Sequence, residues 1–336
     1  MSVRRLTGLR CKMTLRLLLA ATAINAQSLS VVAVSPQGLD LFGPSLEKRS
    51  SRPLVDAFDS KHHPQHPFLA VSRPSQKIIE FYDARTMQPS GDTVQAEARE
   101  LVFTASGDCL IAATPNGLTS VSYAKRTVVT RMTTGFAATS MVVNSARLIA
   151  VGDSATKRVR VFRIGETCKL TDSHFNAAVS GKHASDPVSL AVSPNGEHLI
   201  ALNRSGFIDV YRWRGAALIA AGRIPYPGIA NGFGAVFLPD SSRAYVLTTS
   251  HLMVLEADRL GALHDMKLRI PIGGQRSQSA PGQRPVATDG RMIYLTTRNS
   301  VVALSVERHK IVAETPAGPN PTAIEVSGLW GASAAP

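Results

Sequence analysis

The sequence predicts an all-β protein built as a seven-bladed β-propeller, and three observations support this prediction. Short apolar segments with the alternation of half-buried strands recur along the chain, separated by turns rich in Ser, Pro, Asn and Gly. These segments group into units of about 45 residues, which is the length of a four-stranded propeller blade. No segment after residue 26 has both helical length and a 3.6-residue period, so a stack of helical repeats is disfavoured.

Six units of the repeat align on their turns. The clearest unit, "DPVSLAVSPNGEHLIALNRSGFIDVYRW", predicts a strand, a tight turn, a second strand, a polar turn and a third strand. Where a fourth strand is visible, as in "KRTVVTRMTTG", it is short and ends near Gly or Pro. The six units are residues 52–87, 100–135, 139–165, 186–213, 232–258 and 284–318.

The two ends of the sequence together supply a seventh blade. "NPTAIEVSG" (320–328) has the pattern of a first strand with nothing after it. "SVVAVSPQGLDLFGPSLEKRSS" (30–51) has the pattern of second, third and fourth strands with nothing before them. Pairing the C-terminal strand with the N-terminal strands closes the ring and leaves no long exposed edge. We therefore expect one propeller over residues 27–329, followed by a short tail at 330–336.

Residues 1–26 resemble a signal-like leader. Five basic residues and no acidic one precede or flank a short apolar stretch, and small residues follow it at Ala21, Ala23 and Ala26. This order predicts export to the periplasm or the exterior, while the Arg-rich, acid-free composition also suits a mitochondrial presequence. The start of translation at Met1 or at Met13 stays open, as does the cleavage site. The stretch is too short to span a bilayer, and we expect no membrane span elsewhere.

The charge pattern excludes specific nucleic-acid binding. Removal of the five basic leader residues lowers the formal net charge from +13 to +8, which leaves a basic protein. The remaining Lys and Arg are scattered, with no basic run and no recognition helix. Such a charge favours attraction to anionic ligands or to an acidic partner. We expect a monomer.

Cysteine and histidine give little sign of a metal site. Cys109 and Cys168 fall in different repeats, so we expect two small buried thiols in preference to a disulfide bond. No CxxC motif or His/Cys cluster predicts zinc. The stretch "KHHPQHP" (61–67) predicts an exposed polar turn, because adjacent His side chains diverge. We expect neither a metal nor a cofactor.

The segment "MIYLTTRNSVVALSVERHKIVAETPAGPNPTAIEVSG" (292–328) resembles the repeats of YVTN-type propellers and of lactonase-like seven-bladed propellers. The resemblance covers residues 186–328 well and 28–180 more loosely. It implies the propeller architecture and suggests lactone hydrolysis, but it transfers no catalytic residues. The chain lacks Trp-Asp at strand ends, which argues against an ordinary WD40 protein.

Candidate binding residues lie in the channel-face loops, which are the loops before each innermost strand and those between second and third strands. These loops carry more cations than anions and predict a funnel for an anionic ligand or an acidic partner loop. The candidates before innermost strands are Arg52, Arg99, Glu100, Asp186, Asn231, Arg284 and Asn320. The candidates between second and third strands are Arg204 and Arg298.

Two functions fit these observations. The first is a secreted or periplasmic module that binds a protein partner or a small anionic ligand through this basic face. The alternative is a lactone hydrolase similar to 6-phosphogluconolactonase, acting on an anionic sugar lactone. GxSxG, HExxH and Gly-rich phosphate loops are absent from the sequence, so the residues of a catalytic site are not defined.

Overall fold

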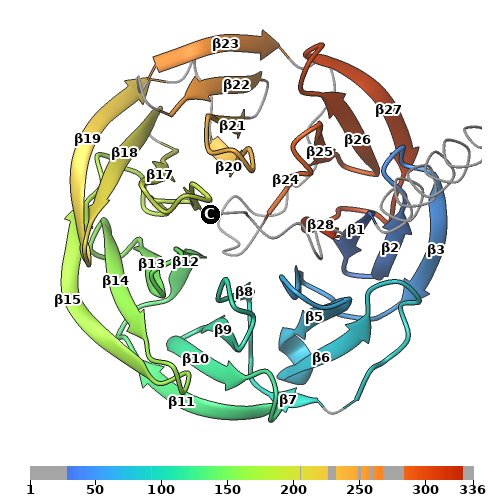
Figure 1. The fold of residues 1–336 in the computed structure, drawn as a ribbon, viewed down its shortest axis with the longest axis horizontal. Coiled ribbons are helices and arrows are strands. Elements are labelled where there is room, and N and C mark those ends of the chain that lie inside the picture. The colour runs from blue at the N-terminus through green and yellow to red at the C-terminus, as the bar shows by residue number, and fades with distance from the viewer. Residues whose placement is uncertain are drawn as a thin grey trace, which may run out of the picture.

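The computed structural model describes residues 29–91, 93–204, 206–225, 232–248, 251–257, 261–267 and 284–327. Within these residues the strands form seven four-stranded antiparallel sheets, arranged as blades around a central axis (Figure 1). Each blade runs from an innermost strand near the axis to an outermost strand at the rim. The predictions of an all-β protein and of seven blades are confirmed.

The strands of each blade follow one another along the chain from the axis outward, except in blade 7. Blade 1 holds β4 (Asp59–His62), β5 (Phe68–Arg73), β6 (Ile78–Asp83) and β7 (Val94–Gln95), with the short 3-10 helix η1 (Pro74–Gln76) between β5 and β6. Blade 2 holds β8 (Glu100–Phe103), β9 (Cys109–Thr114), β10 (Gly117–Ser122) and β11 (Thr127–Thr133). Blade 3 holds β12 (Ala138–Val143), β13 (Leu148–Asp153), β14 (Arg158–Ile164) and β15 (Leu170–Ala178). Blade 4 holds β16 (Ser189–Val192), β17 (His198–Leu202), β18 (Phe207–Arg214) and β19 (Ala217–Pro225). Blade 5 holds β20 (Gly232–Phe237), β21 (Arg243–Thr248), β22 (His251–Glu256) and β23 (Gly261–Lys267). Blade 6 holds β24 (Val286–Thr288), β25 (Met292–Thr296), β26 (Ser300–Ser305) and β27 (Lys310–Pro316). Blade 7 holds β28 (Ala323–Ser327), β1 (Ser30–Ser35), β2 (Gly38–Phe42) and β3 (Lys48–Pro53).

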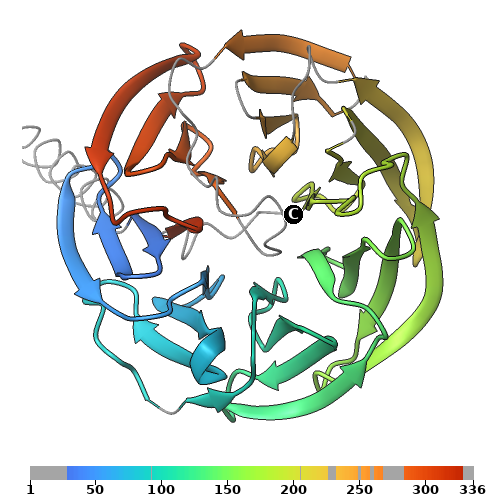
Figure 2. The same cartoon turned by 180° about the vertical axis from the view of Figure 1, so that it is seen from behind.

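Blade 7 is assembled from both ends of the described chain. β28 is its innermost strand and pairs antiparallel with β1, with Val32 opposite Glu325. The hydroxyls of Ser30 and Ser327 lie 2.6 Å apart across 297 residues of sequence. Seen from behind, red β28 lies beside blue β1 (Figure 2). Because β28 occupies the inner edge of β1, that edge is not left unpaired.

The apolar core lies between neighbouring blades. Second and third strands are buried on both faces, as in β9 and β10, whereas the outermost β11 alternates between half-buried and exposed positions. Tyr294 on β25 is fully buried between blades 6 and 7. Its hydroxyl donates to the carbonyl of Pro44 and to Asp289 Oδ2, each at 3.0 Å. Burial of such side chains stabilises the contact between blades by about 1.5–3 kcal/mol each.

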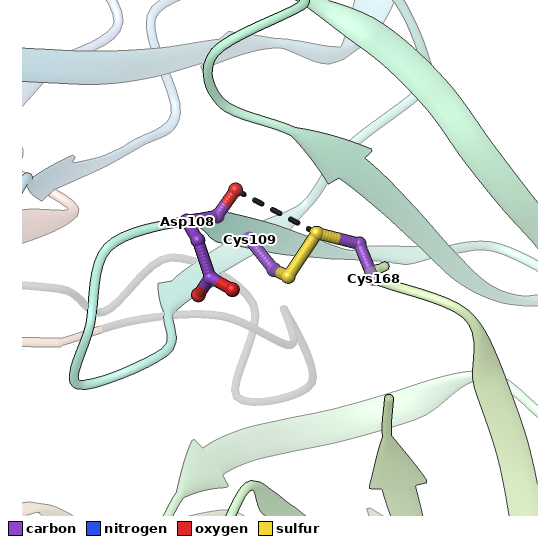
Figure 3. A group of neighbouring side chains, drawn as sticks. All are labelled: Asp108, Cys109 and Cys168. Atoms are coloured by element: carbon purple, nitrogen blue, oxygen red, sulfur yellow. Dashed lines mark hydrogen bonds between the residues drawn. A yellow bond between two sulfur atoms is a disulfide. The ribbon is translucent and has the colours of Figure 1, made fainter. Parts of the chain in front are cut away.

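A disulfide bond joins blades 2 and 3, so the expectation of two free thiols is wrong. Cys109 begins β9, and Cys168 lies in the turn between β14 and β15 (Figure 3). Their Cα atoms are 5.5 Å apart, although 59 residues separate them in sequence. Two different repeats can supply one bond because adjacent blades pack face to face.

The histidine-rich segment 61–67, which begins at the end of β4, is partly buried and not an exposed turn throughout. His66 is exposed, but His62 and His63 are 7% and 2% exposed, so the prediction is wrong for these two residues. His63 Nδ1 accepts the backbone N–H groups of Gln65 and His66, and its ring packs 4.2 Å from that of Tyr123. Burial lowers the pKa of both His62 and His63 to about 4, so they are neutral at pH 7.

The signal-like leader (1–26) and the tail (330–336) lie outside the described residues. In the described part of the chain, no helix has the length and apolar character needed to cross a membrane.

Candidate functional site

A largely buried arginine, Arg284, lies at the centre of the propeller among carboxylates from three blades. Arg284 lies two residues before the start of β24. Its guanidinium lies 3.3 Å from Glu100 Oε1, 3.3 Å from Glu325 Oε1 and 3.4 Å from Asp59 Oδ2. It also donates a hydrogen bond to the carbonyl of Leu101. The carboxylates come from β4, β8 and β28, so the closed ring is what brings them together.

The burial of this cluster sets its protonation. Asp59 is 0% and Glu100 2% exposed. Burial raises the pKa of Asp59 to about 7, opposed by Arg284 and reinforced by Glu100 and Glu325. Burial also raises the pKa of Glu100, and Arg284 opposes this shift. Burial alone would lower the pKa of Arg284, but the three carboxylates raise it above its ordinary value. Arg284 therefore stays charged while the carboxyl groups share a tendency to hold a proton.

Lys61 adds a second cation at the same place. It lies two residues after Asp59 on β4, and its Nζ is 2.7 Å from Glu325 Oε1. With all groups ionised, three carboxylates face two cations, so the cluster is close to neutral and not basic. We call Asp59, Lys61, Glu100, Arg284 and Glu325 the channel cluster.

The channel cluster borders a cavity of about 360 Å³ enclosed by the innermost strands. Lys61, Glu100, Arg284 and Glu325 line it, whereas Asp59 lies behind them. Ser140 on β12 and Ser189 at the start of β16 add hydroxyl groups to the polar lining. Further along, the lining becomes apolar, with Phe103 and Phe237 at the ends of β8 and β20. The cavity therefore offers polar groups at one end and an apolar surface at the other.

Glu100 lines the cavity with little exposed surface, whereas the side chains of Lys61 and Arg284 are 30% and 18% exposed. Glu100 Oε1 accepts from Arg284 and, at 3.4 Å, from the hydroxyl of Ser140. Its Oε2 is buried, and within the described residues no hydrogen bond to it has normal geometry. The backbone N–H of Met141 nevertheless interacts with the Glu100 carboxylate and lowers its pKa, against the effect of burial. A buried carboxylate oxygen without a full set of donors is costly.

Of the candidate residues from the sequence, Glu100 and Arg284 are the two that the structure places in the channel cluster. Arg99 precedes Glu100 and is half-buried. Arg52 lies near the end of the outermost strand β3 and not at the channel. Its guanidinium packs 5.2 Å from the ring centre of Tyr82. The unit beginning at residue 52 in fact has its first strand at Asp59. Asn231 lies outside the described residues.

The remaining candidates organise the channel-face loops. Asp186 is fully buried, and its carboxylate accepts the backbone N–H groups of Arg204 at 2.6 Å and His183 at 2.9 Å. Burial lowers the pKa of Arg204, and Asp186 opposes this shift. Arg298 is exposed, and its carbonyl accepts the backbone N–H of Asn320 at 2.8 Å. These residues connect neighbouring loops, while the groups that meet at the channel form a cluster of mixed charge.

Sequence reasoning missed Asp59, Lys61 and Glu325, although a signal was present. Asp59 and Lys61 are two residues apart in "DSKH" and so share one face of a strand. Glu325 stands inside the otherwise apolar "AIEVS" of an innermost strand. A charged side chain in a strand that is otherwise buried requires a partner, and that requirement points to the channel.

Another group of potential metal ligands includes the disulfide bond that joins blades 2 and 3. Asp108, Cys109 and Cys168 offer atoms within 4.8 Å of one another. The two sulfurs are bonded to each other, so neither is a thiolate that could bind a metal, and Cys168 Sγ lies 3.6 Å from the carbonyl of Asp108 (Figure 3). The Asp108 carboxylate is paired with Arg147 at 2.9 Å.

Comparison with solved structures shows the fold. A functionally unknown protein from Desulfotomaculum acetoxidans is similar over 88% of this chain and 98% of that chain, with a TM-score of 0.79 and 15% identity. The periplasmic gluconolactonase of Pseudomonas aeruginosa is similar over 89% and 99%, with a TM-score of 0.67 and 13% identity. A putative 6-phosphogluconolactonase from Bacteroides fragilis is similar over 90% and 99%, with a TM-score of 0.67 and 12% identity. No protein-family model and no curated protein matches the sequence, so the YVTN-type resemblance stays a prediction.

Proposed function

We propose that the protein binds a small polyhydroxylated ligand, such as a sugar acid or its lactone, in the central channel. The observation that carries the proposal is the charged lining of the cavity, where the side chains of Lys61 and Arg284 are 30% and 18% exposed beside the carboxylate of Glu100. Ligand hydroxyls would donate to Glu100, while Arg284 and Lys61 would attract a carboxylate or phosphate group. We propose that the protein acts as a monomer.

A second candidate function, lactone hydrolysis, is favoured by the position of the same groups. Glu100 with its raised pKa can take a proton from water, and the resulting hydroxide attacks the lactone carbonyl. Lys61 and Arg284 lie where they can stabilise the negative charge that develops on the carbonyl oxygen. The ring C–O bond then breaks, and the leaving oxygen takes the proton from Glu100. The product is the open hydroxy acid. Two of the similar solved structures are described as a gluconolactonase and a putative 6-phosphogluconolactonase, which is consistent with lactone hydrolysis.

We expect the protein to act outside the cytoplasm, in the periplasm or the exterior. The leader-like composition of residues 1–26 supports this location. A disulfide bond in the folded chain also supports it, since such bonds persist in oxidising compartments. One of the similar solved structures is described as periplasmic.

One experiment separates binding from hydrolysis. Gluconate binding is measured by calorimetry, and the opening of D-glucono-1,5-lactone is followed by acid release above the buffer rate. The variant Glu100→Gln keeps the shape of the side chain but removes the base, so we expect any catalysed rate to fall by about 100-fold or more while gluconate still binds. Glu80→Gln, on β6 and paired with Arg73, is the matched control and should change neither readout.

The outcomes distinguish the two functions. Binding of gluconate without acceleration of any sugar lactone would remove the hydrolase and leave the binding module. Equal rates in wild type and Glu100→Gln would remove Glu100 as the base. An absence of both binding and hydrolysis across phosphorylated and unphosphorylated sugar lactones would refute the proposed function.

A further inference from the structure

A groove lined by three arginines lies between blades 5 and 6, away from the channel cluster. Arg243 begins β21, Arg291 directly precedes β25, and Arg308 lies in the turn between β26 and β27. In antiparallel blades these positions all fall on the face opposite the channel-face loops. The groove has a volume of about 740 Å³.

The backbone around two of these arginines is fixed by hydrogen bonds. The N–H of Arg291 donates to Asp289 Oδ1 at 2.8 Å, and the N–H of Arg308 donates to the hydroxyl of Ser305 at 3.1 Å. The carbonyl of Arg291 accepts the N–H of Val306 at 2.9 Å, which ties the two turns together. The arginines are thus presented from an ordered frame, which lowers the entropy cost of binding a ligand.

The turn that carries Arg291 depends on a glycine. Gly290 has φ +90°, a conformation that other residues adopt only with strain, and its N–H donates to the hydroxyl of Thr288. An added Cβ would meet the ring of Pro239 at 3.2 Å. The tight turn allows Arg291 to lie beside the neighbouring blade, where Arg243 begins its strand.

The groove is strongly cationic. Glu307 is the one carboxylate among its described lining residues, against three guanidinium groups. Nearby Asp289 is already engaged, since its Oδ1 accepts backbone N–H groups and its Oδ2 accepts the hydroxyl of Tyr294. Arg243 already interacts with the carboxylate of Asp240 and the hydroxyl of Tyr245. In the part of the chain that the structure describes, Arg291 and Arg308 form no salt bridge with a carboxylate, so their guanidinium groups can meet an anion.

The geometry points to a binding site for a phosphomonoester with a small apolar substituent. Arginine matches the paired oxygens of phosphate with its planar fork, and several guanidinium groups can share one doubly charged phosphate. Met292, Val306 and Val312 line the same groove and supply an apolar surface beside the arginines. Val312 is 46% exposed, so a substituent that covers it removes apolar surface from water.

The test uses phenyl phosphate as the probe, titrated by calorimetry at constant ionic strength, with phenol as the uncharged comparison. We expect phenyl phosphate to bind and phenol to give no heat. The double variant Arg291→Glu with Arg308→Glu should weaken phenyl phosphate binding by at least about tenfold, because charge-assisted hydrogen bonds are replaced by repulsion. The milder Arg291→Gln with Arg308→Gln should show a smaller loss in the same direction.

The matched control is Arg212→Glu with Arg214→Glu, which makes the same charge change at exposed positions on β18 of blade 4. It should leave the affinity within about twofold of the wild type, since distant exposed charges are screened by salt. Melting curves establish that each variant is folded. The proposal is overturned if wild type fails to bind phenyl phosphate, if the groove variants bind it as tightly as wild type, or if the control loses as much affinity.

Discussion

Asp59 has no exposed surface and lies against Arg284, and this position makes stability depend on pH. Its pKa of about 7 in the folded protein compares with an ordinary value of 3.8. Between these pH values the folded protein holds a proton that the unfolded chain releases. The contribution of Asp59 to stability is therefore greatest below about pH 4 and declines as the pH rises towards 7, by up to about 1.4 kcal/mol per pH unit.

We predict that Asp59→Asn removes this decline. The Asn oxygen can still accept the N–H of Leu101, which donates to Asp59 Oδ2 at 2.7 Å. The free energy of unfolding, measured in urea at several pH values from 4.5 to 7.5 in both proteins, gives the difference. The comparison is needed because buried His62 and His63, with pKa values lowered to about 4, make stability rise over part of the same range. Parallel profiles for wild type and variant would contradict the prediction.

Single residues show where prediction from sequence works and where it fails. Glu100 and Arg284 were found because Glu100 begins β8 and Arg284 lies two residues before β24, and strand order places the starts of innermost strands near the channel. Arg52 was misplaced because the outermost strand β3 extends to Pro53, so the next innermost strand begins only at Asp59. His62 and His63 were taken as exposed because local sequence does not reveal which side chains a neighbouring blade covers.

The disulfide bond acts between elements, since it ties β9 to the turn before β15. It closes a loop of 59 residues in the unfolded chain, and this constraint corresponds to about 4 kcal/mol in the chain-entropy model. We predict that Cys109→Ala with Cys168→Ala lowers the free energy of unfolding by about this amount. The same loss should follow reduction of the wild type by dithiothreitol, measured in urea.

Two observations would check the assignment of the bond. Dithiothreitol should leave the stability of the double alanine variant unchanged. The protein, purified and unfolded without reductant, should take up no alkylating reagent at either cysteine. Alkylation of both positions under these conditions would contradict the bond. The sequence could not predict the disulfide bond. The alternation of apolar and polar residues reveals the strands, but the contacts between blades depend on how the blades pack.

At the scale of the whole molecule, blade 7 holds the ring closed. We predict that deletion of residues 320–336 lowers the free energy of unfolding by more than about 3 kcal/mol, because it removes buried Ile324 and the hydrogen bonds of β28 to β1. Deletion of residues 330–336 alone is the control and should change stability by less than about 0.5 kcal/mol. Equal urea transitions for the two truncated proteins would show that β28 does not stabilise the ring.

The architecture was predictable because the blade repeat is encoded locally. Alternating apolar residues and turn residues mark each strand, and the two unmatched pieces at the ends, 30–51 and 320–328, indicate how many blades there are. The charge of the channel was not predictable in the same way. The loops carry more cations than anions, yet the innermost strands bring Asp59, Glu100 and Glu325 around Arg284, and only the closed ring defines that neighbourhood.

The pairing of β1 with β28 also has a consequence in time. Ser30 and Ser327 are 297 residues apart, and ribosomes add about 5 to 20 residues per second, so β1 waits about 15 to 60 s for its inner partner during synthesis. Throughout that interval its backbone edge is open to other chains. Glu325 arrives on the same strand, so the channel cluster is completed only when that edge is covered.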